Sequence, residues 1–279
     1  MRRPSRRLHR GLLAGASLLA VFTAAAVLAP LLAPHDPLAV VDPATPVALQ
    51  RPSTAHLLGT DALGRDVLAR VLFGGRVSLA VGVGVELVVA VLGGVVGLLA
   101  GYYGGMLDAT LMRLTDVVMA FPSLILAIGL IAVFEAPGLA NVFVVLVLLG
   151  WTTIARVVRG TVLTLKSRDY VQAARAIGAR DRTILVRHIL PNAIGPLLVA
   201  ATLGVGGNMV AEAGLSFLGL GAQPPTISWG AMLADGQSDL MTAPWAAVFP
   251  GLALLLAVLG VNLAGDGLRD LLDPRTGAD

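Results

Sequence analysis

Six long apolar stretches constrain this chain more than any other feature of its sequence. A helix needs roughly 20 apolar residues to cross the hydrocarbon core of a membrane. Backbone polar groups must pair within a spanning segment, and these runs lack the alternation typical of barrel strands. We therefore predict an all-α polytopic membrane protein with six transmembrane helices, at about residues 11–33, 77–100, 117–134, 139–158, 197–217 and 246–265.

The composition supports a membrane protein and argues against an enzyme. Hydrophobic residues make up 56% of the 279 residues and charged residues only 13%, about half the share of a soluble domain. The chain has no Cys, which excludes disulfides and thiolate metal sites. Its four histidines lie far apart in the sequence, so we predict neither a catalytic cluster nor a metal site: His9, His35, His56 and His188.

The basic residues predict the orientation, because Arg and Lys accumulate in cytoplasmic segments. Counting Arg156 at the end of the fourth predicted helix, 16 of the 20 fall in the N-terminal tail, the loops 102–116 and 159–192, and the C-terminal tail. Both termini are therefore expected in the cytoplasm. The predicted organisation is a tail and first helix (1–33), an outer segment (34–76), a core of five helices (77–265) and a C-terminal tail (266–279). A cleaved signal peptide is the alternative for the first run, but its roughly 23 apolar residues exceed the usual ~7–15.

Two carboxylates lie inside predicted helices. Glu86 is near the middle of the second run and Glu212 towards the outer end of the fifth. An acidic side chain at the centre of a membrane helix costs about 2.5–3.5 kcal/mol, so neither should face lipid. Both are candidates for the lining of a translocation path. The alternative is a structural hydrogen bond to a neighbouring helix, and for Glu212 support of the loop that follows.

The loop 159–192 has the pattern of a docking surface for another protein. Ser167 or Asp169 can cap a short helix, and Gly178 can end it in the left-handed conformation. A second short helix is predicted from about Asp181 to Leu190-Pro191. Together with Arg156 just before it, the loop carries eight cations, which would also suit anionic lipid headgroups.

The same loop contains a segment that nearly fits a phosphate-binding pattern. It runs from Gly160 to Lys166-Ser167, but Leu165 replaces the second glycine and no strand precedes it. The backbone cradle for phosphate is then missing, so no ATP site is expected in this chain. DNA binding is disfavoured because both ends of the loop enter membrane helices.

Several segments, in order, resemble a known family of transport proteins. Gln172-Ala173-Ala174, Gly178 and residues 189–191 (ILP) are similar to the EAA loop of permease subunits of bacterial ABC importers. The chain resembles in particular the second permease subunit of the dipeptide, oligopeptide and nickel group. It departs from the general pattern at Gln172, where an acidic residue is usual, and at His188, where Ile is usual. Further similar segments are 58–66 (LGTDALGRD), 101–105 (GYYGG) with Asp108, 120–122 (AFP), 215–221 (LSFLGLG) and 229–233 (WGAML).

The resemblance implies a subunit of an ATP-driven importer in the bacterial plasma (inner) membrane. Its expected partners are a second homologous permease, two ATPase subunits that carry ATP and Mg²⁺, an extracytoplasmic solute-binding protein and membrane lipid. The solute stays open among peptides, nickel complexes, glutathione and oligosaccharides, with peptides favoured. An ion-coupled secondary transporter is the alternative function. The ATPase-docking residues would be Asp169, Tyr170, Gln172, Ala173, Ala174, Gly178, Asp181, Leu190 and Pro191.

The outer segments are expected to meet the binding protein. Candidate contacts are Asp61, Arg65 and Asp66 before the second helix and Trp229 before the sixth. Trp also favours the headgroup region, so Trp229 could equally be an interfacial anchor.

Overall fold

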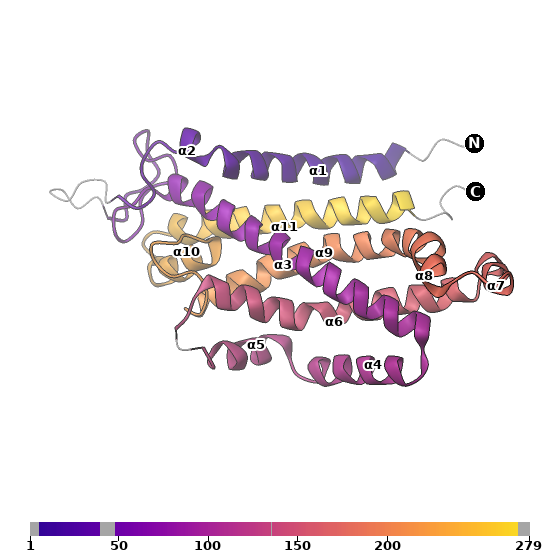
Figure 1. Cartoon of the computed structure of the whole chain (residues 1–279). Helices are drawn as coiled ribbons and strands as arrows, with labels where there is room; N and C mark the ends of the chain where they lie inside the picture. Colours follow the sequence, from indigo (N-terminus) through magenta and orange to yellow (C-terminus); the bar gives the residue numbers. More distant parts are fainter. Residues whose placement is uncertain (1–5, 40–47, 135, 273–279) are drawn as a thin grey trace.

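The structure, a computed structural model, describes residues 6–39, 48–134 and 136–272. The described residues form a bundle of helices lying side by side (Figure 1). The predicted tail residues 1–5 and 273–279 lie outside the described part. The helices are α1 (Arg6–Val27), α2 (Ala29–Leu32), α3 (Val67–Tyr103), α4 (Gly105–Met119), α5 (Ser123–Ile131), α6 (Leu139–Lys166), α7 (Asp169–Ala176), α8 (Asp181–Ile184), the π-helical turn η1 (Leu185–Ile189), α9 (Leu190–Phe217), α10 (Trp229–Gly236), the 3-10 turn η2 (Gln237–Asp239) and α11 (Trp245–Leu272).

The all-helical membrane fold is confirmed, and the number of spans stays a prediction. Four described helices are long and apolar enough to cross a membrane: α3, α6, the continuous helix Asp181–Phe217 and α11. The pair α4 and α5 would make a fifth span, although it is bent by 86°. The apolar part of α1, Gly11–Val27, is shorter than the other spans.

The second predicted helix starts earlier than its apolar run. α3 begins at Val67 rather than at 77, because Asp66 caps it by accepting a hydrogen bond from the Ala69 N–H at 2.8 Å. The first turns of α3 contain Arg70 and Arg76, so they were not part of the apolar run from which the helix was predicted. The outer segment therefore gives way to helix at 67 and not at 77.

The third predicted span was wrong in its extent. Residues 102–116, expected to be a loop, belong mostly to α4, which starts at a turn formed by Gly104 and Gly105 with φ of +68° and +57°. The helix then breaks at Phe121-Pro122 before α5 begins at Ser123. Proline has no N–H for the preceding turn, and it disfavours helical geometry in the residue before it, which explains the break.

The second short helix of the docking loop does not stop at Leu190-Pro191 as predicted. α8 begins at Asp181 as expected, but it continues through η1 into α9. Pro191 has no N–H to donate to the carbonyl four residues earlier, and its ring crowds that carbonyl. The wider π turn directly before Pro191 is a known way for a helix to absorb such a defect.

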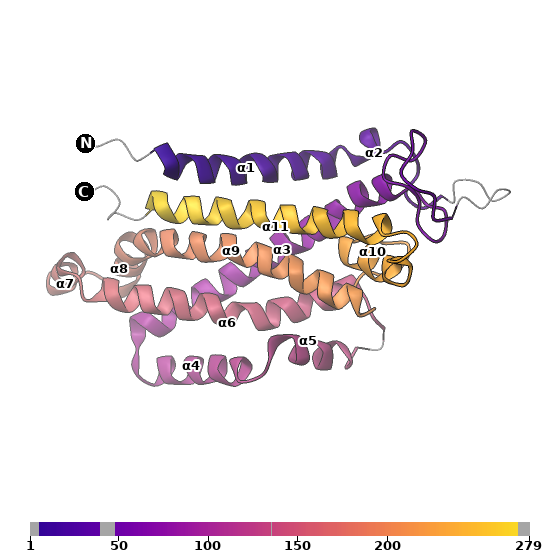
Figure 2. The same ribbon diagram turned by 180° about the vertical axis from the view of Figure 1, so that it is seen from behind.

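Both ends of the described chain lie at one end of the bundle. The start of α1 and the end of α11 are neighbours there, together with α7 and α8 (Figures 1 and 2). The opposite end holds α2, α10 and the segment that follows α2. This arrangement is what the orientation prediction requires, while the side of the membrane stays a prediction.

α3 is the centre of the packing and contacts α6, α9, α1 and α11. Its glycines Gly93, Gly97 and Gly101 recur every fourth residue and face α6. A Cβ at Gly97 would lie 2.4 Å from the Ala155 carbonyl oxygen. Small residues let membrane helices approach this closely, because lipid offers no hydrophobic drive for helix association.

Candidate translocation cavity and docking loop

A cavity of about 800 Å³ opens between α3, α5, α6 and α9. Its wall is mainly apolar, with Ala127 on α5, Leu146 on α6 and Leu203 on α9. Glu86 and Asn208 supply the polar groups at its α3–α9 side. A pocket of this size and chemistry is in the range that holds a small organic solute.

Glu86 lies at this cavity and is also hydrogen-bonded to a neighbouring helix, so its position agrees with both sequence interpretations. The side chain is only 4% exposed, and its Oε2 accepts a hydrogen bond from Asn208 Nδ2 at 2.8 Å. Its Oε1 is buried without a hydrogen-bond partner among the described residues. A Cβ at Gly204 would lie 2.3 Å from the carboxylate, so only glycine leaves room for it.

Glu212 is placed differently and does not line the cavity. It is fully buried, where its Oε1 accepts from Ser216 Oγ at 2.7 Å and its Oε2 from Ser78 Oγ at 3.2 Å. Ser216 Oγ also accepts from the Ala222 N–H of the loop after α9. The carboxyl thus connects α3, α9 and that loop, which matches the structural alternative.

A charged network joins the outer segment to α10. Arg65 Nε and Asp61 Oδ2 lie 2.7 Å apart, and Arg70 Nε is 3.4 Å from the same oxygen. Both arginines also reach Asp235 Oδ2, at 3.2 and 3.1 Å. The pairing of Arg70 with Asp235 spans 165 residues, so no local sequence pattern indicates it.

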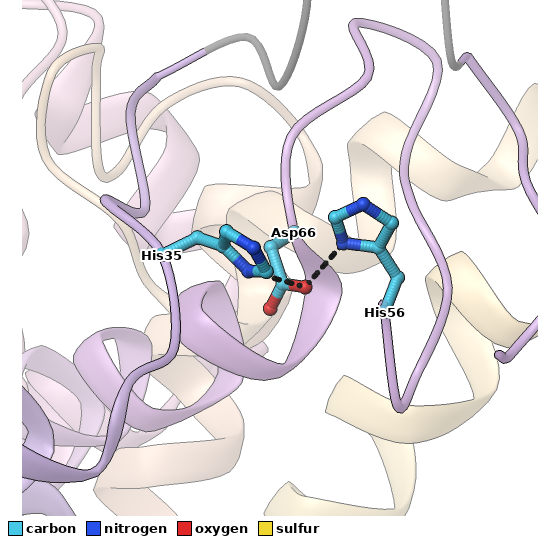
Figure 3. Close-up of side chains that lie close together, drawn as sticks. All are labelled: His35, His56 and Asp66. Atoms are coloured by element: carbon cyan, nitrogen blue, oxygen red, sulfur yellow. Dashed lines mark hydrogen bonds and ion pairs between the residues drawn. The ribbon is translucent and has the colours of Figure 1, made fainter. Parts of the chain in front are cut away.

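Asp61, Asp66 and Trp229 were expected on an outer surface, but all three are buried within the chain, with 7%, 0% and 2% exposure. Trp229 donates its indole N–H to the Val71 carbonyl at 2.9 Å and packs edge-on against Phe22. Asp66 caps α3 and lies next to His56 and His35 (Figure 3). In this conformation none of the three offers a surface to a partner. The histidines expected to be dispersed are in fact brought together in one pair.

The turn that terminates α7 is formed at Gly178, as predicted. This residue has φ +81°, and the N–H groups of Gly178 and Ala179 donate to Arg175 and Ala174 carbonyls at 3.0 Å. These two bonds form a Schellman motif. The predicted side-chain cap was wrong: the N-cap residue is Arg168, and no side chain caps the helix.

Most of the expected docking residues are exposed at the end of the bundle. Ala174 is buried and Leu190 half-buried, so these two support the loop from beneath. Ile177 was missed by sequence analysis, although it is 85% exposed between α7 and Gly178. The sequence signal for it is an apolar residue directly before the glycine that terminates the helix, where exposed apolar side chains often mark an interface. The exposed members are Asp169, Tyr170, Gln172, Ala173, Gly178, Asp181 and Pro191.

Polar contacts hold the loop against α3 and α6. Tyr102 on α3 donates its hydroxyl to Asp181 Oδ1 at the start of α8. Lys166 donates to the Tyr102 carbonyl, and Gln172 Nε2 donates to the Lys166 carbonyl at 2.8 Å. A glutamate at position 172 could not donate this last bond.

Comparisons with known proteins agree with this architecture. The family described as binding-protein-dependent transport system inner membrane component matches residues 93–278. The glutathione transport system permease protein GsiD of Pectobacterium atrosepticum is 50% identical over 224 residues, which are 80% of this chain and 74% of that protein. Proteins of the same name from Escherichia coli O6:K15:H31 and Shigella boydii serotype 4 are 47% identical over the same shares.

These matches do not support the ion-coupled alternative, and they locate the protein in the inner membrane. The sequence motifs already resembled this family. The identity of about one half to the GsiD proteins, over most of both chains, and the apolar helices of the structure agree with that resemblance. The chain therefore belongs to the family of binding-protein-dependent transport system inner membrane components and is a permease subunit of an ABC importer.

Proposed function

We propose that this permease forms, with a second related permease, a translocation path for glutathione or peptides of similar size. The glutathione transport named in its relatives supports this solute class. The cavity of about 800 Å³ is large enough for such a molecule. Glu86 and Asn208 offer a carboxylate oxygen and an amide to its polar groups.

The observation that carries the proposal is the continuous helix Asp181–Phe217. Its first turns belong to the docking loop, and its middle supplies Gly204, Gly207 and Asn208 to the cavity wall. A helix is stiff along its axis, so displacement of α8 by a partner would reach the cavity without an intervening hinge loop. The π turn η1 and Pro196 lie between the two regions, and the helix continues through both.

Two ATPase subunits would bind ATP and Mg²⁺, and one of them would contact the docking loop. The exposed Tyr170 and Ile177 give this loop an apolar centre, and Arg175 and Arg180 surround it with charge. An apolar centre with a charged rim is typical of protein interfaces. A solute-binding protein would approach the opposite end, where Arg65 is only partly buried beside exposed Leu63.

Gly178→Val tests the coupling role of the loop. A β-branched side chain in the left-handed conformation costs about 1–2 kcal/mol, so the Gly178 turn should open and displace α7. In reconstituted importer, the solute transported per ATP hydrolysed is expected to fall at least about fivefold. The assay measures uptake and ATP hydrolysis on the same vesicles.

Two variants make this result specific. Gly178→Asn should retain coupling, because Asn tolerates left-handed geometry and no atom lies within 4 Å of an added Cβ there. Gly160→Ala, an equally open glycine within α6, should behave as wild type. Wild-type coupling in Gly178→Val would contradict the docking role.

A further inference from the structure

We propose that His35, His56 and Asp66 form a binding site for a divalent transition metal ion, with Zn²⁺ as the best fit. The three side chains come from separate parts of the chain and converge at the end of the bundle opposite α7 and α8 (Figures 1 and 3). His35 follows α2, His56 lies in the turn-rich segment before α3, and Asp66 caps α3.

The distances suit a shared ion. Asp66 Oδ2 lies 2.8 Å from His56 Nδ1 and 3.3 Å from His35 Nδ1, and the candidate ligand atoms are all within 4.8 Å of one another. Tetrahedral Zn²⁺ binds nitrogen and oxygen at about 2.0–2.2 Å, which separates two of its ligands by roughly 3.4 Å. The His35–Asp66 distance is already close to that spacing, and the His56–Asp66 distance is shorter, so the ion would enter with a small rotation of the half-exposed His35 ring and a slight separation of His56 from Asp66.

The hydrogen bonding of the cluster is incomplete without an ion. His35 Nδ1 is buried and has no hydrogen-bond partner among the described residues, although Asp66 Oδ2 is 3.3 Å away. A metal would accept the lone pairs of both imidazoles and compensate the charge of the buried carboxylate. The structure therefore contains an unsatisfied nitrogen aimed at the position of the proposed ion.

Two of the three ligands are already held in place. The second oxygen of Asp66, Oδ1, accepts from the Ala69 N–H at 2.8 Å. The backbone N–H of His56 donates to Ser53 Oγ at 3.1 Å, and its backbone carbonyl accepts from the Ser53 and Gly59 N–H groups. The bond to Asp66 orients that carboxylate directly, as bonds to metal ligands do, and the His56 bonds hold the backbone that carries its ring.

The third ligand stands beside open space. His35 lines a cavity of about 750 Å³ with Asp36, Phe73 and Arg76, and Arg76 lies over the Phe73 ring. This cavity gives an ion a way in and leaves room for water as a fourth ligand.

The ligand set indicates the class of metal. Two imidazoles and one carboxylate suit Zn²⁺, Ni²⁺, Co²⁺ or Cu²⁺, whereas Mg²⁺ and Ca²⁺ prefer oxygen ligands throughout. A bound ion would join the stretch after α2 to the first turn of α3, and it would stabilise the segment between them.

The test is Zn²⁺ binding to the complete importer, purified in detergent with a tag free of histidine. The complex is first treated with a chelator, which is then removed. Isothermal titration calorimetry is expected to show one Zn²⁺ ion bound per copy of this chain. His56→Asn should abolish this binding, and His35→Asn should weaken its affinity by at least about tenfold. His188→Asn, which changes a histidine at the other end of the bundle, should retain it. The Co²⁺-loaded wild type should show an absorption spectrum that His35→Asn loses.

Thermal unfolding gives an independent reading, because an ion that binds only the folded state raises Tm. Zn²⁺ should raise the Tm of wild type and His188→Asn but not of His35→Asn. His35 is partly exposed, so its variant is expected to fold and can decide the question if His56→Asn does not. Equal Zn²⁺ binding in wild type and His35→Asn, or no binding in wild type, would overturn the proposal.

Discussion

Replacing Gly97 with valine is expected to prevent this permease from reaching its native packing. A Cβ at this position would lie 2.4 Å from the Ala155 carbonyl oxygen and 3.0 Å from the Arg159 backbone nitrogen. Backbone atoms of α6 cannot move aside as a side-chain end could. We expect a loss of stability of about 3 kcal/mol or more, beyond the usual cost of overpacking because backbone is displaced. The measurement is Tm and folded yield in detergent.

Gly94 provides the matched control for this prediction. It lies three residues earlier in α3, but its Cβ would meet only the Leu197 side chain at 3.6 Å, an ordinary contact. Gly94→Val should therefore give nearly wild-type yield and Tm. Equal stability of the two variants would show that α3 and α6 are not packed as closely as the structure has them.

Glu86→Gln is expected to lower transport at least about tenfold while the protein stays folded. Glutamine has nearly the same volume and keeps an oxygen for Asn208, whose Nδ2 lies 2.8 Å from Oε2. It removes the ionisable carboxyl next to the cavity, and a hydrogen bond to a charged group contributes about 1.5–3 kcal/mol. Uptake of glutathione into vesicles containing the complete importer measures the effect.

Glu212→Gln is the control for the loss of a buried carboxyl in general. Its partners Ser78 and Ser216 are hydroxyls that can rotate to donate or accept, so we expect a stability loss of about 1 kcal/mol and normal transport per folded complex. Wild-type uptake of glutathione and of other peptides by Glu86→Gln would end the assignment of Glu86 to the path.

Much of the fold could be predicted because lipid imposes a simple rule. A spanning segment must be helical and apolar, so the runs containing Val89, Val145 and Leu254 were found by hydropathy alone. The rule fails where a helix continues beyond the apolar run. α3 begins ten residues early because Asp66 caps it, and α6 extends to Lys166. Charged turns are compatible with helix but not with the interior of a membrane.

The candidate sites also divide into features that a local sequence pattern predicts and features that distant residues form together. The Gly178 turn followed from local backbone chemistry, since glycine adopts positive φ at low cost. The contact of Glu86 with Asn208 joins residues 122 positions apart, and no local pattern predicts it. The same holds for His35 and His56, which looked dispersed until the chain folded back on itself.

The sequence by itself determined the helical membrane fold, the family resemblance and the loop that presents α7. These depend on hydropathy, on motif order and on local turn geometry, all of which act over a few residues. The tertiary structure alone decided that Glu86 lies at a cavity and Glu212 does not, and that Asp66 and Trp229 lie inside the chain. A polar residue in an apolar run must find a partner, but the identity of that partner depends on how distant helices pack.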